Sequence, residues 1–176
     1  MTKQDLLNQL SHIDRNARLS FCFSSILANK KTPIDVANVQ IGELTIQCSD
    51  LFVNASDKEN IHTVIDEYTK SSLRTLVREM TEKIRGYTNA TGQYHLIEYN
   101  DTFNYSRILR NSFSHEYVIS FKGYKEKILT KRDIWWRGKC FTISMEGSVL
   151  DKTIFGYQDA FLLSYDLQEL SQHTLR

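Results

Sequence analysis

Apolar residues recur at helical spacing through the middle of this chain, and this run constrains the fold more than any other feature. Most of them are three or four residues apart: Ile61, Val64, Ile65, Tyr68, Leu76, Met80 and Ile84. Such spacing places them on one face of an α-helix. Ser56 and Glu59 have the spacing of a capping box, and Gly86 is suited to a helix end. The run therefore predicts the longest helix of the fold, followed by a loop over residues 87–92.

Helical patterns also occupy both ends of the chain. An apolar stripe predicts a first helix over residues 3–30, and it consists of Leu6, Leu7, Leu10, Ile13, Ala17, Phe21 and Ile26. Phe161, Leu162, Tyr165 and Leu170 predict a last helix over about residues 157–170. Between these, residues 93–99 form a short amphipathic piece, and Asp101 is suited to cap the helix that follows it.

Residues 34–55 have two interpretations. Apolar residues alternate at three and four, at Ile34, Ala37, Ile41, Leu44, Cys48, Leu51 and Ala55, and this predicts a second helix of about 20 residues. Thr32-Pro33 before it is typical of a helix start. Gly42 and the β-branched residues favour the alternative, in which Val39 to Ile46 is a strand.

The hydrophobic period changes after Tyr117. Apolar and smaller residues alternate from Tyr117 to Phe121, and W-W-R-G-K-C-F-T-I at residues 135–143 resembles two short strands joined at Arg137-Gly138. The fold class is therefore mainly α, a bundle of about four to five helices with a small β-hairpin inserted before the last helix. A chain of 176 residues without a long linker predicts a single domain over residues 1–176.

Composition limits the cellular locations and the binding partners that the sequence predicts. The 22 basic and 21 acidic residues nearly cancel, so nucleic-acid binding would need local clusters of charge. No stretch approaches the roughly 20 apolar residues of a membrane span, and the N-terminus is a poor signal peptide. The three cysteines, Cys22, Cys48 and Cys140, are far apart and lie among apolar residues. These features predict free thiols and a cytoplasmic protein that does not contact a membrane.

The residues with chemical capability are concentrated between Leu109 and Tyr117, in the sequence L-R-N-S-F-S-H-E-Y. On a helix, apolar side chains share one arc, and the opposite arc carries Arg107, Arg110, Asn111, Ser114 and His115. Arg110 and His115 lie roughly 140° apart on an ideal helix. They can converge on one phosphate only if the last turn loosens or if a second copy of the chain supplies one of them.

The segment from Arg110 to Tyr117 resembles the R-x4-H-x-Y signature of the HEPN superfamily, the higher eukaryote and prokaryote nucleotide-binding domains. An arginine and a histidine at this spacing with a tyrosine two residues later arise by chance in roughly one or two chains in a hundred. Asn111 directly after the arginine strengthens the resemblance. It covers eight residues closely and the helical layout only loosely, and the predicted hairpin resembles the larger members associated with plasmid and phage defence.

The resemblance implies a metal-independent endoribonuclease that acts as a homodimer with a composite active site, in toxin–antitoxin or antiviral defence. Cleavage yields a 2′,3′-cyclic phosphate, and it needs a base, an acid and positive charge at the phosphorane. Histidine suits proton transfer near neutral pH, and arginine suits the charge. The implied catalytic residues are Arg110 and His115, with Asn111 orienting the histidine or a phosphate oxygen.

Tyr117 and Ser114 are the supporting residues of the site. In HEPN toxins paired with nucleotidyltransferase antitoxins, adenylylation of the motif tyrosine silences the nuclease. Tyr117 occupies that position, so the resemblance implies a nucleotidyltransferase as a partner that modifies Tyr117.

A second cluster of basic residues indicates RNA binding. Besides Arg107 on the polar arc, the cations are Lys122, Lys125, Lys127, Lys131, Arg132, Arg137 and Lys139, and they are interleaved with Tyr124, Trp135 and Trp136. Such a composition suits phosphate contacts with base stacking. The alternative is a solvated basic hairpin, in which neighbouring tryptophans face opposite ways and only one is free to stack.

Other site types find no support in the sequence. The remaining histidines and the cysteines lack metal-ligand spacing, and no glycine-rich phosphate loop is present, so neither a metal nor a cofactor is predicted. Two alternatives to the nuclease remain. One is a catalytically silent HEPN-type module that binds RNA or protein, and the other is a surface helix in which Arg110 pairs with Glu116 or Asp101 and His115 caps the helix end.

Overall fold

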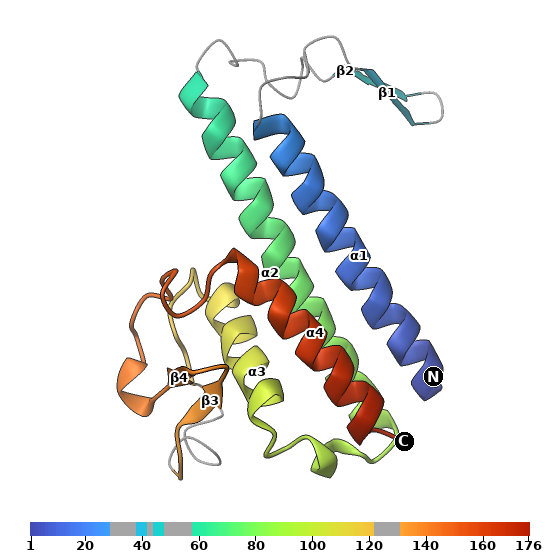
Figure 1. Cartoon of the computed structure of the whole chain (residues 1–176), viewed down its shortest axis with the longest axis vertical. Helices are drawn as coiled ribbons and strands as arrows, with labels where there is room; N and C mark the ends of the chain where they lie inside the picture. The colour runs from blue at the N-terminus through green and yellow to red at the C-terminus, as the bar shows by residue number, and fades with distance from the viewer. Residues whose placement is uncertain (29–37, 42–43, 48–57, 122–130) are drawn as a thin grey trace. The chain divides into compact units, whose positions relative to one another are not determined.

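The computed structural model describes residues 1–28, 38–41, 44–47, 58–121 and 131–176 (Figure 1). The chain is mainly helical, with a two-stranded antiparallel hairpin before the last helix, as the sequence predicts. Its contacts divide it into two compact units, one of Met1–Asn16 with Leu73–Arg176 and one of Ala17–Ser72. The prediction of a single domain stays a prediction. The first unit carries the motif and is called the larger unit below.

Four α-helices make up most of the described chain. They are α1 (Lys3–Ala28), α2 (Lys58–Ala90), α3 (Asp101–Ser114) and α4 (Tyr157–Thr174). At the start of α1, the Thr2 hydroxyl accepts a hydrogen bond from the Asp5 amide, and the Asp5 carboxylate accepts one from the Thr2 amide. These bonds satisfy amides that have no partner within the helix. Among the described residues, no helix is both long and apolar enough to cross a membrane.

Helix α2 extends further than the sequence predicts. It is the longest described helix, as expected, but it continues through Gly86 to Ala90, so the predicted loop at residues 87–92 is wrong for its first four residues. Tyr87 and Thr88 are buried, and Thr88 bonds back to the Ile84 carbonyl. Their burial outweighs the weak helix propensity of one glycine. The predicted capping residue Ser56 lies outside the described residues.

Residues 38–41 and 44–47 form strands instead of the helix that the periodicity predicts, and residues 42–43 lie outside the described residues. Strand β1 (Asn38–Ile41) pairs antiparallel with β2 (Leu44–Gln47), with Val39 opposite Ile46 and Ile41 opposite Leu44. The alternative interpretation is therefore confirmed as to strand conformation, but the structure has two paired strands where it predicts one. Val39 with Ile41 and Leu44 with Ile46 alternate at the period of a strand, and β-branched residues favour that conformation. The rest of the predicted helix, residues 34–37 and 48–55, lies outside the described residues.

The core of the larger unit joins all four helices. Its fully buried side chains include Leu6, Leu10, Met80, Ile84, Phe103, Ile108, Leu163 and Leu167. Helix α3 packs against α4 and against β3 (Figure 1). A buried hydrogen bond of 2.7 Å from the Ser164 hydroxyl to the Asp14 carboxylate links α4 to α1. Burial of both polar groups is tolerated because each satisfies the other.

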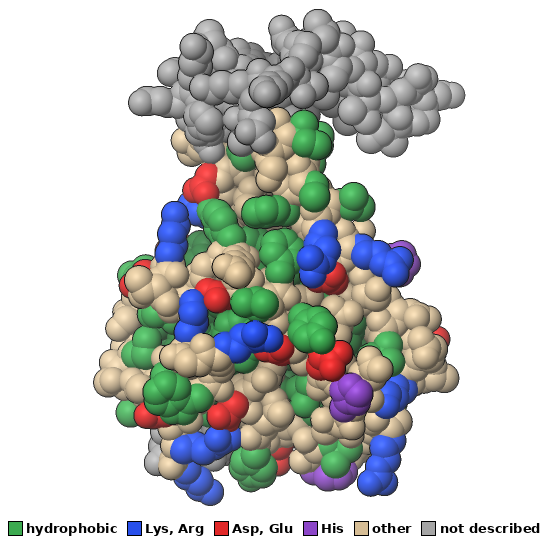
Figure 2. All heavy atoms as spheres, viewed as in Figure 1, with side chains coloured by type: hydrophobic (Ala, Val, Ile, Leu, Met, Phe, Trp, Pro, Cys, Tyr) green, Lys and Arg blue, Asp and Glu red, His purple; other side chains and the backbone are tan. Residues whose placement is uncertain are grey.

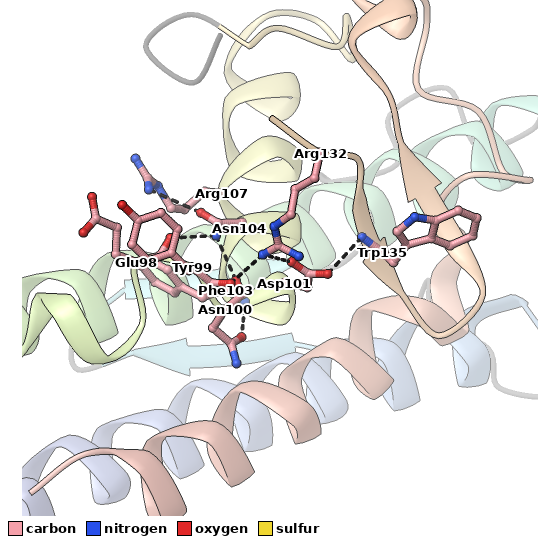
Figure 3. Close-up of polar contacts among 9 residues, drawn as sticks. All are labelled: Glu98, Tyr99, Asn100, Asp101, Phe103, Asn104, Arg107, Arg132 and Trp135. Carbon is pink, nitrogen blue, oxygen red and sulfur yellow. Dashed lines mark hydrogen bonds and ion pairs between the residues drawn. The ribbon is translucent and has the colours of Figure 1, made fainter. Parts of the chain in front are cut away.

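The start of α3 is capped by Asn100 and not by Asp101 as predicted. The Asn100 side-chain oxygen accepts the Phe103 amide at 3.0 Å, and Asp101 is the first helical residue (Figure 3). A short 3-10 turn, Tyr94–Leu96, precedes this cap in place of the predicted amphipathic piece. Asn104, fully buried, donates to the Glu98 and Asn100 carbonyls. These bonds fix the first turn of the helix that carries the motif.

The second hairpin lies beside α3. Strand β3 (Ile134–Trp136) pairs with β4 (Lys139–Phe141), and Arg137 and Gly138 between them have φ of 47° and 77°. Positive φ at both central residues is the geometry of a type I′ turn. The prediction that only one tryptophan is free to stack is confirmed, since Trp136 is buried against Tyr105 and Trp135 is 55% exposed.

Candidate functional site

The motif lies where α3 ends and the chain turns. Arg110 and Asn111 are in the last turn but one, Ser114 is the last helical residue, and His115 is the C-cap. The Ser112 carbonyl accepts the backbone amides of both His115, at 3.1 Å, and Tyr117, at 2.9 Å. The helix therefore closes with backbone bonds that leave the His115 side chain exposed to solvent.

Two residues after the C-cap adopt a left-handed backbone. Glu116 has φ of 54° and Tyr117 has φ of 64°, although neither is glycine. This region costs a non-glycine residue about 1 kcal/mol or more. Backbone bonds hold it in place, since the Leu150 amide donates to the Tyr117 carbonyl at 2.7 Å and Val118 forms an isolated bridge with Val149. Among the described residues from Tyr117 to Phe121, where apolar and smaller residues alternate, the strand pairing consists of this bridge.

Arg110 is held by two neighbours. Its Nη1 donates to the Asn111 side-chain oxygen at 2.8 Å, and its Nη2 forms an ion pair with Glu82 of α2. The side chains of Arg110 and Glu82 are 33% and 39% exposed, so the pair lies at the protein surface. No hydrogen bond links Arg110 to His115 in the described chain. The guanidinium is thus accessible to solvent while its charge is balanced.

Tyr117 packs into a cluster of rings and one cation. The Arg74 guanidinium of α2 lies 5.1 Å from the centre of its ring, and Phe113 meets the ring edge-on at 5.7 Å. Phe113 in turn contacts Phe155. The half-buried Tyr117 therefore connects the motif to α2, while Ser114 only bonds back to the Arg110 carbonyl.

Two of the predicted RNA-binding arginines are Arg107, in the middle of α3, and Arg132, which contacts the first residue of α3 (Figure 3). Arg107 donates to the Tyr94 hydroxyl at 2.7 Å and lies over the rings of Tyr94 and Phe103. Arg132 pairs with Asp101 at 2.5 Å and donates to the Tyr99 carbonyl. Both side chains are therefore already engaged by the protein.

The cations of the hairpin are engaged in the same way. Arg137 makes two bonds to Asp166 of α4, at 2.7 and 2.8 Å, and Lys139 pairs with Asp159 at 2.5 Å. The Arg137 guanidinium and, secondarily, the Trp136 Nε1 bond lower the pKa of Asp166. Lys131 is exposed, whereas Lys122, Lys125 and Lys127 lie outside the described residues. Ion pairing thus neutralises two of the cations that the sequence predicts to bind RNA.

Sequence reasoning missed Glu82 and Arg74, which contact Arg110 and Tyr117. Both lie on α2, eight residues apart and so near one face of the helix. No local pattern in the sequence shows that this face of α2 lies next to the end of α3. The contact between these elements arises from tertiary packing.

The surface of the described chain has mixed charge. On the face drawn in Figure 2, blue basic and red acidic side chains are interspersed with green apolar ones. Within the described ranges, no group of three or more histidine, cysteine or acidic side chains could hold a metal ion.

Comparisons with known proteins identify no relative, since no protein-family model, curated protein or solved structure matches this chain.

Proposed function

We propose that this protein is a metal-independent endoribonuclease of the HEPN type. The observation that carries the proposal is that an R-x4-H-x-Y segment presents both an exposed histidine, His115, and a solvent-accessible arginine, Arg110. The strained backbone at Glu116 and Tyr117 supports it, because such strain is concentrated at functional sites. We place the activity in the cytoplasm, in toxin–antitoxin or phage-defence biology.

The proposed reaction uses only groups of the RNA and the protein. The 2′-oxygen attacks the adjacent phosphorus, the bond from phosphorus to the 5′-oxygen breaks, and a 2′,3′-cyclic phosphate and a 5′-hydroxyl result. A base removes the 2′-hydroxyl proton and an acid protonates the leaving oxygen, roles that His115 can fill in two copies of the chain. Arg110 stabilises charge on the phosphorane, and Asn111 orients the histidine or a phosphate oxygen.

The geometry of one chain favours a composite site. Arg110 is engaged by Glu82 and Asn111, and His115 is at the C-cap without a bond to Arg110. A second copy that faces the first would bring another histidine and another arginine to the same phosphate. Tyr117, which Arg74 and Phe113 contact, would support the site. Its hydroxyl oxygen is buried, so regulatory adenylylation by a nucleotidyltransferase partner would require a rearrangement that exposes this oxygen.

RNA cleavage in EDTA tests the proposal. Purified protein should cut single-stranded RNA without divalent cations, and His115→Ala should abolish cleavage, since removal of a proton-transfer group costs roughly a hundredfold or more. His12→Ala is the matched control, because His12 is also exposed and lies on α1 of the same unit. Cleavage that requires Mg²⁺, or that survives His115→Ala, would contradict the proposal.

A second candidate function is a catalytically silent module that binds RNA or protein through the same face. The ion pair between Arg110 and Glu82 favours it, because a neutralised guanidinium is a weaker stabiliser of the transition state. This candidate predicts RNA binding without product. It also predicts that toxicity on overexpression is absent or does not depend on Arg110 and His115.

A further inference from the structure

Helix α2 carries a line of arginines beside the motif that no sequence pattern assigns to RNA. Arg74, Arg78 and Arg85 lie within about 40° of one another on an ideal helix and extend over about 16 Å of its length. They are called the α2 arginine stripe below. Arg78 and Arg85 are exposed, and Arg74 is partly exposed. The buried side of this part of α2 begins next to the stripe, since Thr81 is buried and lies within about 60° of each of the three arginines. The buried apolar residues of this side are Leu73, Leu76, Val77, Met80, Ile84 and Tyr87.

The stripe is contiguous with the motif through two described contacts. The Arg74 guanidinium lies over the Tyr117 ring, and Glu82, one turn after Arg78, pairs with Arg110. The end of α3 therefore lies along the edge of the stripe. Any RNA phosphate that reaches Arg110 comes within a turn or two of these arginines.

The charges of the stripe differ from those of the hairpin cluster. Arg132, Arg137 and Lys139 each pair with an aspartate. Within the described chain, Arg78 and Arg85 take part in no ion pair. Two exposed guanidiniums without acidic partners, next to a third, produce a local positive potential in a molecule whose net charge is only +1.

We propose that the α2 arginine stripe binds the phosphate backbone of single-stranded RNA and directs it across the motif. Arginine suits this role because its planar group donates two bonds to one phosphate. Arg78 lies one turn after Arg74, and Arg85 lies two turns after Arg78. Each arginine can therefore contact a different phosphate along the helix. The proposal rests on the proposed function for the identity of the nucleic acid, but it concerns binding alone.

Fluorescence anisotropy with an RNA that cannot be cleaved tests the stripe. The probe is a labelled single-stranded oligonucleotide of about 12 nucleotides with 2′-O-methyl groups, which lack the attacking hydroxyl. Arg78→Ala with Arg85→Ala should weaken binding roughly tenfold at physiological salt. It should also flatten the slope of log affinity against log salt by about 1.4, or 0.7 for each lost phosphate contact.

Lys83→Ala is the matched control. Lys83 is on the same helix with the same charge, but about 140° to 180° from the three arginines. It should change affinity less than twofold, and circular dichroism should show all variants folded, since alanine favours helix. Equal weakening by Lys83→Ala, or no weakening by the arginine variants, would overturn the inference.

The two proposals fail in distinguishable ways. Cleavage that depends on His115 combined with unchanged binding by the arginine variants would overturn the stripe and leave the nuclease standing. Binding that depends on the stripe without any cleavage by the unaltered protein would overturn the nuclease and leave the stripe standing.

Discussion

Arg110 illustrates how one side chain can be both accessible and restrained. Its two terminal nitrogens contact Asn111 and Glu82, so the orientation of the guanidinium is fixed before any ligand arrives. An exposed ion pair contributes at most about 1 kcal/mol to folding. In the proposed nuclease, a phosphodiester would therefore replace Glu82 at little cost, and the balance between these two anions would set the affinity for RNA.

Glu82→Gln should tighten the binding of the uncleavable RNA roughly fivefold, because it removes a competing negative charge worth about 1 kcal/mol. Thermal stability should hardly change. Anisotropy measures the affinity, and Glu79→Gln on the same helix is the control for a general change in charge.

The gain should vanish in an Arg110→Ala background, since Glu82 then has no cation to compete for. Weaker binding by Glu82→Gln would mean that Glu82 positions the arginine instead of competing with RNA.

At this scale the sequence predicts residue types better than contacts. The order of the eight residues from Arg110 to Tyr117 shows the R-x4-H-x-Y pattern directly. The position of His115 near a helix end follows from the change of hydrophobic period after Tyr117. The partners Glu82 and Arg74 are separated from the motif by some 30 to 40 residues of chain, and only packing of α2 against α3 brings them near. Local patterns contain no such information.

The hairpin of β3 and β4 is fixed to α4 through one carboxylate. Asp166 accepts bonds from the Trp136 indole at 2.8 Å and from two nitrogens of Arg137. Trp136 is buried, so its indole needs an acceptor. The Asp166 carboxylate thus accepts a bond from the buried Trp136 indole and balances the charge of Arg137 in the turn.

Asp166→Asn should lower the free energy of unfolding by about 1 to 2 kcal/mol at pH 7, because charge-assisted bonds to an arginine are lost. The pKa of Asp166 is lowered in the folded state, so the carboxylate adds stability above its unfolded pKa. That contribution disappears as pH falls through the folded pKa. Urea unfolding at pH 7 and at about pH 3 should therefore show a difference between the proteins that shrinks on acidification.

Glu169→Gln serves as the control for this effect, since Glu169 is also on α4 but pairs with the exposed His173. It should change stability by less than about 0.5 kcal/mol at pH 7. A cost of Asp166→Asn that stays constant from pH 7 to pH 3 would show that the charge of Asp166 does not stabilise the fold.

Elements differ in how well sequence predicts them. Helices α1 and α2 follow from long apolar stripes, and the turn at Arg137-Gly138 follows from its glycine. The helical pattern also predicts α4, but the buried apolar residues of α4 are Ala160, Leu163 and Leu167 and not the four on which the prediction rests. Residues 38–47 are ambiguous, because Ile41 and Leu44 have helical spacing whereas Val39 with Ile41 and Leu44 with Ile46 have the spacing of a strand, and only strand pairing decides. The Asn100 cap was missed because Asn100 and Asp101 are both good caps, and their order alone does not choose between them.

At the scale of the whole molecule, the proposed chemistry requires two chains. Unaltered protein that is unfolded and refolded with an equal amount of His115→Ala protein should keep about a quarter of the cleavage rate of the same total amount of unaltered protein. Only a quarter of the dimers would then hold both histidines, whereas chains that act independently would keep about half. The measurement is RNA cleavage in EDTA, with light scattering to confirm the dimer.

The same two proteins refolded separately and then assayed together provide the control for exchange of chains, and they should keep about half of the rate. About half of the rate in confirmed mixed dimers would mean that His115 acts within one chain.

The left-handed backbone at Glu116 and Tyr117 also has a consequence for how this protein can change over time. Glycine at such a position removes a strain of about 1 kcal/mol from the folded state. It also increases the conformational entropy of the unfolded chain, which lowers stability by somewhat less than that. A selection for thermal stability alone would thus favour glycine at 116, and at 117 it would favour glycine at the expense of the tyrosine. The substitutions that relieve this backbone strain therefore lie within or beside the proposed site.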